Sequence, residues 1–208
     1  MTKGTRLERL ATGVVEEAAA KNGRPRATSR AELERVGFEL FARRGFDEVT
    51  VEDIASAAGV GRRTFFRYYA TKNALVWGDF DGQIAHLRDL LAAIPESVPT
   101  MEALRIAIVE FNRYDEHTLP WHRRRMELIL KVPALQADST LRYNAWRAVV
   151  VEFAAGRAGL PTTALEPVLI GNVALATSVT AYELWLQDDA SDLTELIDEG
   201  FRRVAAGL

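Results

Sequence analysis

Residues 62–69 carry the side chains of this chain that are best suited to bind a polyanion. Arginine guanidinium groups bind guanine edges or phosphates, and threonine and tyrosine hydroxyls suit phosphate oxygens. At about 100° per residue, a helix over this range puts Phe65 and Tyr69 on one face with Phe66 beside them, where we expect all three to pack on neighbouring helices. The other face carries the polar residues Arg63, Thr64, Arg67 and Tyr68, and Arg62 lies at the helix start.

The two segments before this helix have the signals of helices that could support it. Ser29 and Glu32 match a capping box, and apolar residues then recur at helical spacing up to Gly45, which ends the helix. Thr50 begins a second short helix, which Gly59 ends. Two short helices joined by a glycine-containing turn form a helix-turn-helix, which places its second helix in the major groove of DNA. The alternative is a solvated basic helix on an ordinary helical domain.

The charge of the chain is distributed unevenly. The formal net charge is −3 over 208 residues, which by itself argues weakly against nucleic acid. Residues 21–72 nevertheless hold 11 Lys and Arg against 7 Asp and Glu, whereas residues 73–208 hold 12 against 19. A basic segment joined to an acidic one indicates that only the first part meets a polyanion. Residues 1–28 end in a basic stretch broken by Gly23 and Pro25, which suits either a disordered tail or an arm that binds DNA.

The remainder of the chain is also helical by pattern, so we expect an all-α fold. No segment shows strand-like alternation with hairpin turns. The apolar segment from Pro167 to Trp185 is interrupted by polar residues, so it indicates a buried helix and no membrane span. Helices are expected over residues 71–91, 101–117, 120–131, 138–158, 164–187 and 192–206. The expected domains are an N-terminal arm at 1–28, a DNA-binding helix-turn-helix domain at 29–75 and a larger helical domain at 76–208, whose roles depend on the resemblance given below.

The sequence lacks the residues that several kinds of disulfide, metal and catalytic site require. The chain has no cysteine, which excludes disulfides and thiolate zinc sites and fits a reducing cytoplasm. The three histidines, His86, His117 and His122, have no metal-ligand spacing. The sequence contains no glycine-rich phosphate loop, no nucleophile elbow and no zinc-protease motif. We therefore expect no metal, no cofactor and no catalytic residue, and a helical enzyme is the remotest alternative.

Most aromatic and methionine residues at helical spacing in the second part of the chain are expected to pack in the hydrophobic core, and some line a cavity if one is present. A polar group within an apolar helix is the stronger pointer to a cavity, because burial without a partner is costly. Asn172 fits that description, and an interhelical hydrogen bond is its alternative. The run Arg123–Arg125 is either a solvated helix face or a site for an anionic effector such as a carboxylate or phosphate. The candidate ligand-binding residues are Phe111, Tyr114, Arg125, Met126, Trp146 and Asn172.

Residues 29–75 resemble the DNA-binding domain of TetR-type regulators. The matching segments are ELFARRGF at 39–46, TVEDIASAAGV at 50–60 and the FFRYY-x-TK run that ends at Lys72. Phe66 departs from many members of the family, in which a tyrosine hydroxyl at this position often touches phosphate, and Phe66 cannot donate a hydrogen bond. The DNA contacts of the family map onto Thr50, Arg62, Arg63, Thr64, Tyr68 and Lys72, and the helix face described above adds Arg67.

Shorter segments, GRPRATSRAELE at 23–34, GRRTFFRYY at 61–69 and WGDFD at 77–81, are similar to regulators associated with mycofactocin biosynthesis. The family resemblance implies about nine helices, an effector cavity in the body and a homodimer through the last two helices, here about 164–187 and 192–206. It implies a cytoplasmic repressor that leaves a palindromic operator in double-stranded DNA when a small-molecule effector binds, with acyl-coenzyme A as the effector class that it suggests first. An activator and an effector-independent DNA-binding protein are the alternatives.

Overall fold

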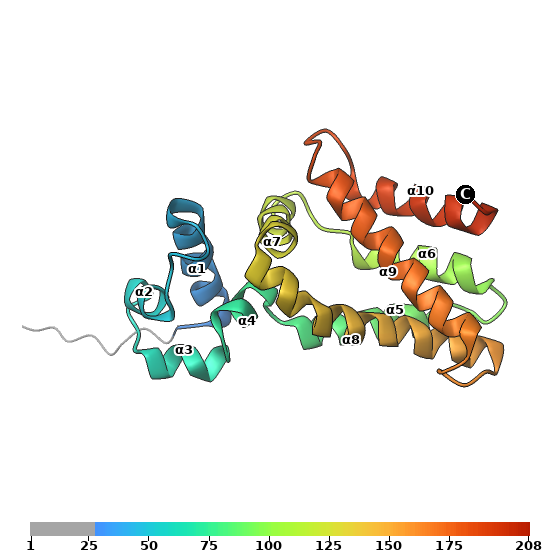
Figure 1. Cartoon of the computed structure of the whole chain (residues 1–208), viewed down its shortest axis with the longest axis horizontal. Helices are drawn as coiled ribbons and strands as arrows, with labels where there is room; N and C mark the ends of the chain where they lie inside the picture. The colour runs from blue at the N-terminus through green and yellow to red at the C-terminus, as the bar shows by residue number, and fades with distance from the viewer. Residues whose placement is uncertain (1–27) are drawn as a thin grey trace, which may run out of the picture.

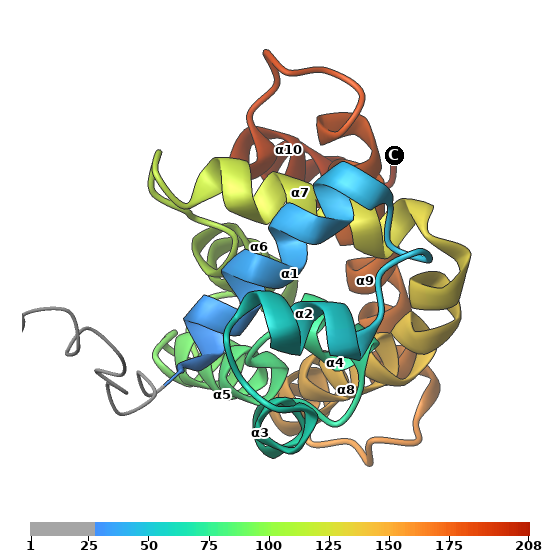
Figure 2. The same ribbon diagram turned by 90° about the vertical axis from the view of Figure 1, so that its left-hand side faces the viewer.

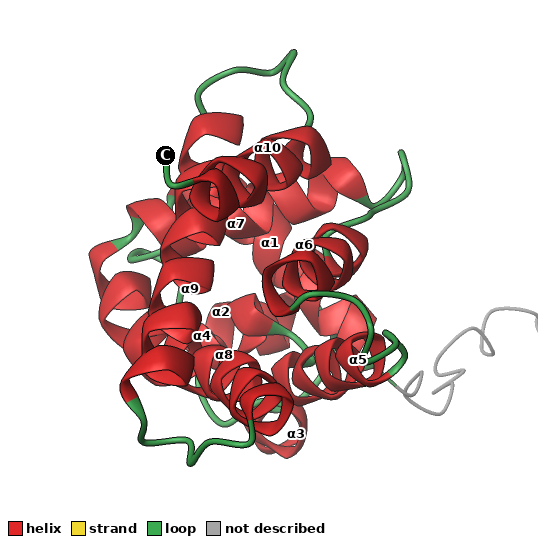
Figure 3. Ribbon diagram, turned by 90° about the vertical axis from the view of Figure 1, so that its right-hand side faces the viewer, coloured by secondary structure: helices red, strands yellow, loops and turns green. Residues whose placement is uncertain are grey.

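The computed structural model describes residues 28–208, and every regular element in that range is a helix (Figure 3). The predicted all-α fold is confirmed, with ten helices in the described range where the resemblance implies about nine. The expected N-terminal arm lies outside the described residues, apart from Thr28. The helices are α1 (Arg30–Arg44), α2 (Val51–Ala57), α3 (Arg62–Tyr68), α4 (Lys72–Trp77), α5 (Phe80–Ala92), α6 (Thr100–Phe111), α7 (Leu119–Lys131), α8 (Pro133–Ala158), α9 (Leu165–Trp185) and α10 (Leu193–Ala206).

Helices α1–α3, called the head below, lie together at one end of the molecule, and α3 lies at its outer edge (Figures 1 and 2). Helices α5–α10 form the body, in which α8 packs along α9 and α10 packs on α6 and α9. Helix α4 joins head and body, because it packs on both α1 and α7. Helix α7 lies between α1 and the rest of the body (Figure 1).

Two hydrophobic cores hold these parts together. The first contains the buried side chains of the head and continues into the body through Ile129 of α7 and Leu135 of α8. The second lies among α5, α6, α8, α9 and α10, where Trp185, Ile197 and Phe201 are nearly or fully buried. Because the first core crosses from head to body, a change in the position of α7 also changes what supports the head.

Gly78 divides a segment that the sequence pattern predicts as one helix over residues 71–91. The structure has α4 ending at Trp77 and α5 beginning at Phe80. Gly78 has φ +64° and ψ −135°, a conformation that L side chains rarely adopt, so the helix cannot continue through it. Asp79 then caps α5, since its carboxylate accepts a hydrogen bond from the Gly82 N–H. The prediction was wrong here because apolar spacing does not reveal a glycine that has left the helical region.

Helices α6 and α8 also differ from their expected bounds, whereas α7 agrees with its prediction to within one residue. Helix α6 ends at Phe111 instead of near His117, because the Asp115 carboxylate accepts from the backbone N–H groups of His117 and Thr118 and forms a turn. Helix α8 begins at Pro133 instead of near Asp138, and only Val132 separates it from the end of α7. Proline suits a first helical position, since its missing N–H would have no helical partner there.

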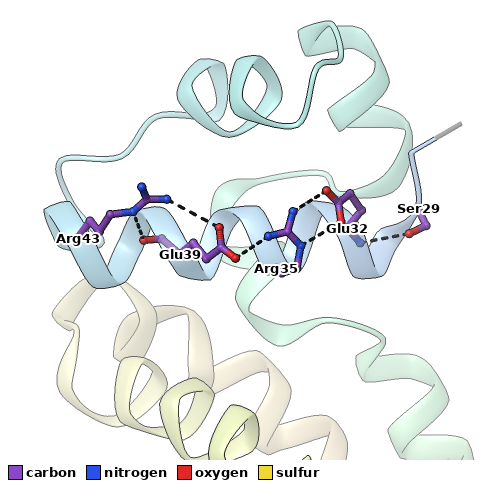
Figure 4. A network of polar contacts seen from close by, with 5 residues as sticks. All are labelled: Ser29, Glu32, Arg35, Glu39 and Arg43. Carbon is purple, nitrogen blue, oxygen red and sulfur yellow. Dashed lines mark hydrogen bonds and ion pairs between the residues drawn. The ribbon is translucent and has the colours of Figure 1, made fainter. Parts of the chain in front are cut away.

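A row of charged side chains runs along the exposed side of α1 (Figure 4). The Ser29 hydroxyl accepts from the Glu32 N–H and caps the helix as predicted, whereas the Glu32 carboxylate binds Arg35 and does not complete the predicted capping box. The Arg35 guanidinium binds the carboxylates of both Glu32 and Glu39, and Arg43 also pairs with Glu39. These pairs are solvent-exposed, so each stabilises α1 only slightly. Their spacing of three or four residues nevertheless favours the helix that supports the head.

Helix α9 is less buried than its apolar sequence predicts. By length and composition it could cross a membrane, the single such helix in residues 28–208, yet only 28% of its most apolar window is buried. Its inner stripe packs on α8 and α10, whereas Leu165 and Leu169 on its outer stripe are 82% and 55% exposed. The prediction of a buried helix is therefore wrong for the outer half of α9. A monomer that leaves such a stripe in water has a surface suited to a partner.

Candidate functional site

The first part of the site is the turn that presents α3. The Thr50 hydroxyl oxygen accepts from the Asp53 N–H at 3.1 Å, and the Asp53 carboxylate accepts from the Thr50 N–H at 2.8 Å, which completes a capping box for α2. The hydrogen bonds from Thr50, together with Arg44, lower the pKa of Asp53 to about 2. Gly59 has φ +68°, which the turn between α2 and α3 requires. The sequence therefore fixes where α3 begins.

Helix α3 has one anchored face and one free face. Phe65 is fully buried and Tyr69, which follows the helix as its C-cap, is 3% exposed, so both pack in the first core as predicted. Arg63 and Arg67 are exposed on the outer face. Both arginines are therefore on the solvent side of α3. Figure 2 shows that this helix lies at the edge of the head. This arrangement can insert into a groove of DNA.

Phe66 is placed differently from the sequence expectation. It is 41% exposed, and its ring meets Phe65 edge-on with 5.6 Å between ring centroids. The Arg62 guanidinium lies 5.3 Å from the centroid of the Phe66 ring and pairs with Glu52 at 2.9 Å. The prediction that Phe66 packs on the first two helices is wrong, because Phe65 and Tyr69 already fill the contact that α3 makes with them. Phe66 instead positions Arg62 at the helix start.

Three other predicted DNA contacts, on α3 and at the start of α4, differ in how far their side chains are buried and in whether they already have hydrogen-bond partners. Thr64 is half-buried on α3. The Tyr68 side chain is half-buried instead of facing outward, because its hydroxyl donates to the Thr28 carbonyl at 2.7 Å. The Lys72 ammonium donates to the carbonyls of Phe46 at 2.7 Å and Val49 at 2.8 Å. Lys72 therefore ties the start of α4 to the loop between α1 and α2, and burial lowers its pKa.

The second part of the site is a cavity in the body, called the central cavity below. Its volume is about 280 Å³, and residues of α4–α9 line it. Five of the six predicted ligand residues line it, namely Phe111, Tyr114, Arg125, Met126 and Trp146. Further lining residues that sequence reasoning did not select include Trp77, Asn112, His122, Tyr143, Ser178 and Tyr182. Most of its wall is aromatic or aliphatic, which suits an apolar ligand.

Asn172, the sixth predicted ligand residue, lies outside the central cavity. It is exposed on α9, and its side-chain oxygen accepts from Arg147 Nη1 of α8 at 2.7 Å. Asn144, also exposed, accepts from Arg147 Nη2 at 2.9 Å. The alternative weighed for Asn172, an interhelical hydrogen bond, is what the structure shows. The same criterion of a polar group in an apolar helix would have found Tyr182, one turn after Ser178 on the inner stripe.

A chain of hydrogen bonds crosses one wall of the central cavity. The Tyr182 hydroxyl donates to Asn112 Oδ1 at 2.5 Å, and the Asn112 amide donates to the Ile108 carbonyl at 2.7 Å. His122 Nε2 lies 2.8 Å from the Tyr182 oxygen. Because the one hydroxyl proton goes to Asn112, the network assigns a proton to His122 Nε2. Burial, with the positive charge of Arg125 as a smaller cause, lowers the pKa of His122 to about 3, so the imidazole is neutral.

Helix α7 faces the central cavity and the head at the same time. Trp121 and Arg125 both line the cavity. The Trp121 ring also lies 4.5 Å from the ring of Phe38 in α1, measured between centroids. Arg125 Nη2 donates to Glu34 Oε2 of α1 at 2.5 Å, and the Tyr69 hydroxyl donates to Glu34 Oε1 at 2.6 Å. A ligand in the cavity therefore touches side chains that hold α1 and the end of α3.

The arginine run at 123–125 divides among three environments. Arg123 pairs with Asp189 at 2.8 Å and donates to the Trp185 carbonyl at 2.6 Å, so it ties α7 to the end of α9. Arg125 lines the cavity, whereas Arg124 is exposed. The interpretation as a solvated face therefore fits Arg124 alone. Within residues 28–208, no group of three or more His, Asp and Glu side chains is placed to hold a metal ion.

Comparison with known proteins places these features in one family. Residues 35–76 match the tetR family of bacterial regulatory proteins, and residues 98–208 match the MftR C-terminal domain. The chain is 45% identical over 186 residues to the mycofactocin biosynthesis transcriptional regulator MftR of Mycobacterium tuberculosis, covering 89% of this chain and 94% of that relative.

Solved structures show the same fold at low identity. SmeT, the repressor of a multidrug efflux pump of Stenotrophomonas maltophilia, superposes with a TM-score of 0.63 at 15% identity, covering 87% of this chain and 90% of SmeT. FadR of Thermus thermophilus, a repressor solved in complex with lauroyl-CoA, superposes with a TM-score of 0.55 at 23% identity, covering 86% of this chain and 95% of FadR. The chain therefore belongs to the TetR family of bacterial transcriptional regulators, in the branch with the MftR-type C-terminal domain.

Proposed function

We propose that this regulator is a repressor that binds a palindromic operator as a homodimer and leaves it when a small molecule fills the central cavity. The observation that carries the proposal is the outward placement of Arg63 and Arg67 on α3, with Phe65 and Tyr69 anchoring the opposite face. Arginine at such a position reads a guanine edge or binds a phosphate. A helix held only by its inner face is free to enter the major groove.

Within the head, Arg63 is the base-reading residue of this proposal. Arg62, Thr64 and Arg67 are the phosphate contacts, since they flank Arg63 on the exposed side of α3 or at its start. Thr50, Tyr68 and Lys72 remain predicted DNA contacts. The side chains of Tyr68 and Lys72 already donate to backbone carbonyls, so their first effect is to fix the position of α3.

The surface that supports a dimer is the outer face of α8 and α9. Leu165 and Leu169 of α9 and Leu141 of α8 are more than half exposed, and the small residues Ala145 and Ala148 of α8 are exposed between them. Two copies of this face can form a four-helix bundle with two-fold symmetry. The sequence expectation named α9 and α10 instead. The exposed side of α10 is largely charged, with Glu195, Glu199, Arg202 and Arg203, which favours α8 as the partner of α9.

The effector of the proposal is an acyl-coenzyme A. The central cavity is lined mainly by apolar side chains and has room for a medium-length chain, and FadR, which shares the fold, was solved with lauroyl-CoA. A cavity of about 280 Å³ also argues against an effector-independent DNA-binding protein. Ligand binding would change the separation of the two heads, which must match half-sites about 34–36 Å apart per turn of DNA.

A gel-shift experiment tests the proposal. The DNA upstream of the protein's own gene, which would carry the operator if the repressor regulates itself, is titrated with protein at two salt concentrations. We expect a salt-sensitive shift that lauroyl-CoA reverses. Scrambled DNA of equal length is the control. Absence of a shift on upstream and on other palindromic DNA would overturn DNA binding, and a shift that lauroyl-CoA leaves unchanged would overturn the effector class.

A further inference from the structure

Two buried N–H groups of cavity-lining residues have no hydrogen-bond partner among residues 28–208. They are Nε1 of Trp77 and Nε of Arg125. Trp77 is 9% exposed, and the Arg125 side chain is 19% exposed. The two residues are neighbours in the cavity wall, since Arg125 Nη1 donates to the backbone carbonyl of Trp77 at 3.5 Å. A buried donor without an acceptor costs free energy, so these residues are suited to meet an acceptor that comes with a ligand.

The charges around this pair favour an anion. Arg125 is the one cation that lines the central cavity, and the described lining includes no Asp or Glu. A second guanidinium, that of Arg142, lies 4.9 Å from the centroid of the Trp77 ring and pairs with Asp138 outside the lining. The positive charge of Arg125 also contributes to the low pKa of His122. Arg125 pairs with Glu34 and Arg142 with Asp138, and both carboxylates lie outside the lining, so the charge that faces the cavity itself is that of Arg125.

We propose that the ligand of the central cavity is an apolar molecule with an acidic group, and that this group accepts hydrogen bonds from Trp77 Nε1 and Arg125 Nε. The inference rests on the proposed function, because it describes the effector of the same cavity. The acidic group is a carboxylate in a free fatty acid and a phosphate in an acyl-coenzyme A, whose thioester is neutral. A carboxylate has acceptor sites for both donors, and hydrogen bonds assisted by charge are about twice as strong as neutral ones. The aromatic and aliphatic remainder of the lining contacts the apolar part.

The same arginine connects the acid to the head. An acid at Arg125 competes with Glu34, which now accepts from Arg125 at 2.5 Å. Glu34 is 15% exposed in its side chain, and without Arg125 it keeps the Tyr69 hydroxyl as its remaining bonded partner among the described residues. A buried carboxylate that loses its cation is strongly disfavoured. Because Glu34 belongs to α1 and Tyr69 caps α3, the acid loosens the head from α7 and lowers operator affinity.

Titration calorimetry with decanoate and decan-1-ol tests the recognition step on the full-length protein. The two probes share the same chain and differ in the acidic group. We expect decanoate to bind at least tenfold more tightly. Equal affinity for the alcohol would overturn the inference. The inference would also be overturned if the protein did not bind decanoate and bound lauroyl-CoA equally well with and without the Arg125→Gln substitution. That result would leave the proposed effector class intact.

Variants locate the preference. Arg125→Gln should reduce the tenfold ratio to near one, and Trp77→Phe, which keeps the ring and removes the donor, should reduce it severalfold. Arg124→Gln is the matched control on the exposed side of the same helix and should keep the ratio. If Arg125→Gln does not fold, Trp77→Phe decides alone. An unchanged ratio in Trp77→Phe or in a folded Arg125→Gln contradicts the assignment.

Glu34→Gln tests the connection to the head. We expect it to bind decanoate more tightly than the unchanged protein, since the competing carboxylate is gone. We also expect decanoate to shift its operator affinity by a smaller factor in gel shifts. An equal factor in both proteins would overturn the competition. Calorimetry needs no DNA, so the two proposals can fail separately. A protein that binds decanoate through Arg125 but gives no gel shift with DNA would contradict the proposed function and would leave the ligand assignment unchanged.

Discussion

Arg63 lies on the exposed face of α3 because Phe65 and Tyr69 occupy the opposite face, and the three positions are fixed relative to one another by the helix alone. The capping box of α2 and the turn at Gly59 then determine which way that face points. The outward placement of the two arginines could therefore be predicted from the sequence, since it depends on local geometry and on the simple preference of aromatic rings for burial.

Replacement of Arg63 by alanine should weaken operator binding by about 1–3 kcal/mol, roughly 5–150-fold, if Arg63 reads a base. Fluorescence anisotropy with labelled operator measures the loss, and the discrimination against mismatched operators should fall with it. Arg67→Ala should instead weaken binding to all sequences and reduce the salt slope by about one. Arg124→Ala, in the body, is the control. Unchanged affinity in Arg63→Ala would refute the base-reading role.

Tertiary contacts give three side chains partners that the sequence pattern does not predict. Tyr68 and Lys72 donate to backbone carbonyls of distant segments, and Asn172 accepts from Arg147 on another helix. Helical periodicity says which face a side chain occupies but not which segment packs there. The five predicted ligand residues that line the cavity are large apolar or aromatic groups and one arginine, and such groups line the space wherever helices do not pack closely.

His122 makes the stability of the protein sensitive to acid. Its pKa is about 3 in the folded protein and about 6.5 in an unfolded chain. Below about pH 6.5 the unfolded chain binds a proton that the folded protein does not, so the unfolding free energy falls as the pH drops, by up to about 1.4 kcal/mol per pH unit. Urea unfolding at pH 7.5 and 5.0 should show a smaller fall for His122→Gln than for the unchanged protein.

The control for this measurement is His86→Gln, since His86 is exposed. That variant should follow the unchanged protein at both pH values. Carboxylates titrate in all three proteins alike, so the comparison isolates His122. If His122→Gln lost as much stability as the unchanged protein between the two pH values, the buried imidazole would not be neutral as described.

At the scale of elements, the helical character of each segment was predictable, whereas the division at Gly78 and several helix ends were not. The start of α1 at Ser29 and of α2 at Thr50 follow from side-chain caps, which are local. The break at Gly78 depends on contacts made after folding, because Arg125 Nη1 would lie 2.5 Å from a Cβ placed there. The glycine thus lets the backbone approach the guanidinium that binds Glu34.

Gly78→Ala should therefore destabilise the protein by about 1–3 kcal/mol, through its positive φ and through the displaced Arg125. Chemical denaturation with far-ultraviolet circular dichroism measures the effect. Gly61→Ala is the matched control, since Gly61 has φ −79° and no neighbouring atom within 4 Å of an added Cβ. Equal stability of the two variants would contradict the strained conformation described for Gly78.

At the scale of the whole molecule, a substitution at an exposed leucine distinguishes a dimer interface formed by α8 and α9 from one formed by α9 and α10. Leu169→Glu on α9 should convert the dimer to a monomer and abolish tight binding to a palindromic operator, since each head alone binds one half-site. Ala205→Glu, on the exposed side of α10, should leave the dimer intact. Analytical ultracentrifugation at micromolar concentration distinguishes them. A dimer that persists in Leu169→Glu but dissociates in Ala205→Glu would place the interface on α10.

Trp121 contacts Phe38 of the head with one side and the central cavity with the other. Thermodynamic linkage makes such a shared wall act in both directions, so DNA lowers ligand affinity by the same factor by which the ligand lowers DNA affinity. Regulator molecules bound to an operator then need a higher ligand concentration to respond than molecules that are free of DNA. If the regulator is the proposed repressor, the effector concentration at which transcription begins depends on the number of DNA sites per protein as well as on the cavity itself.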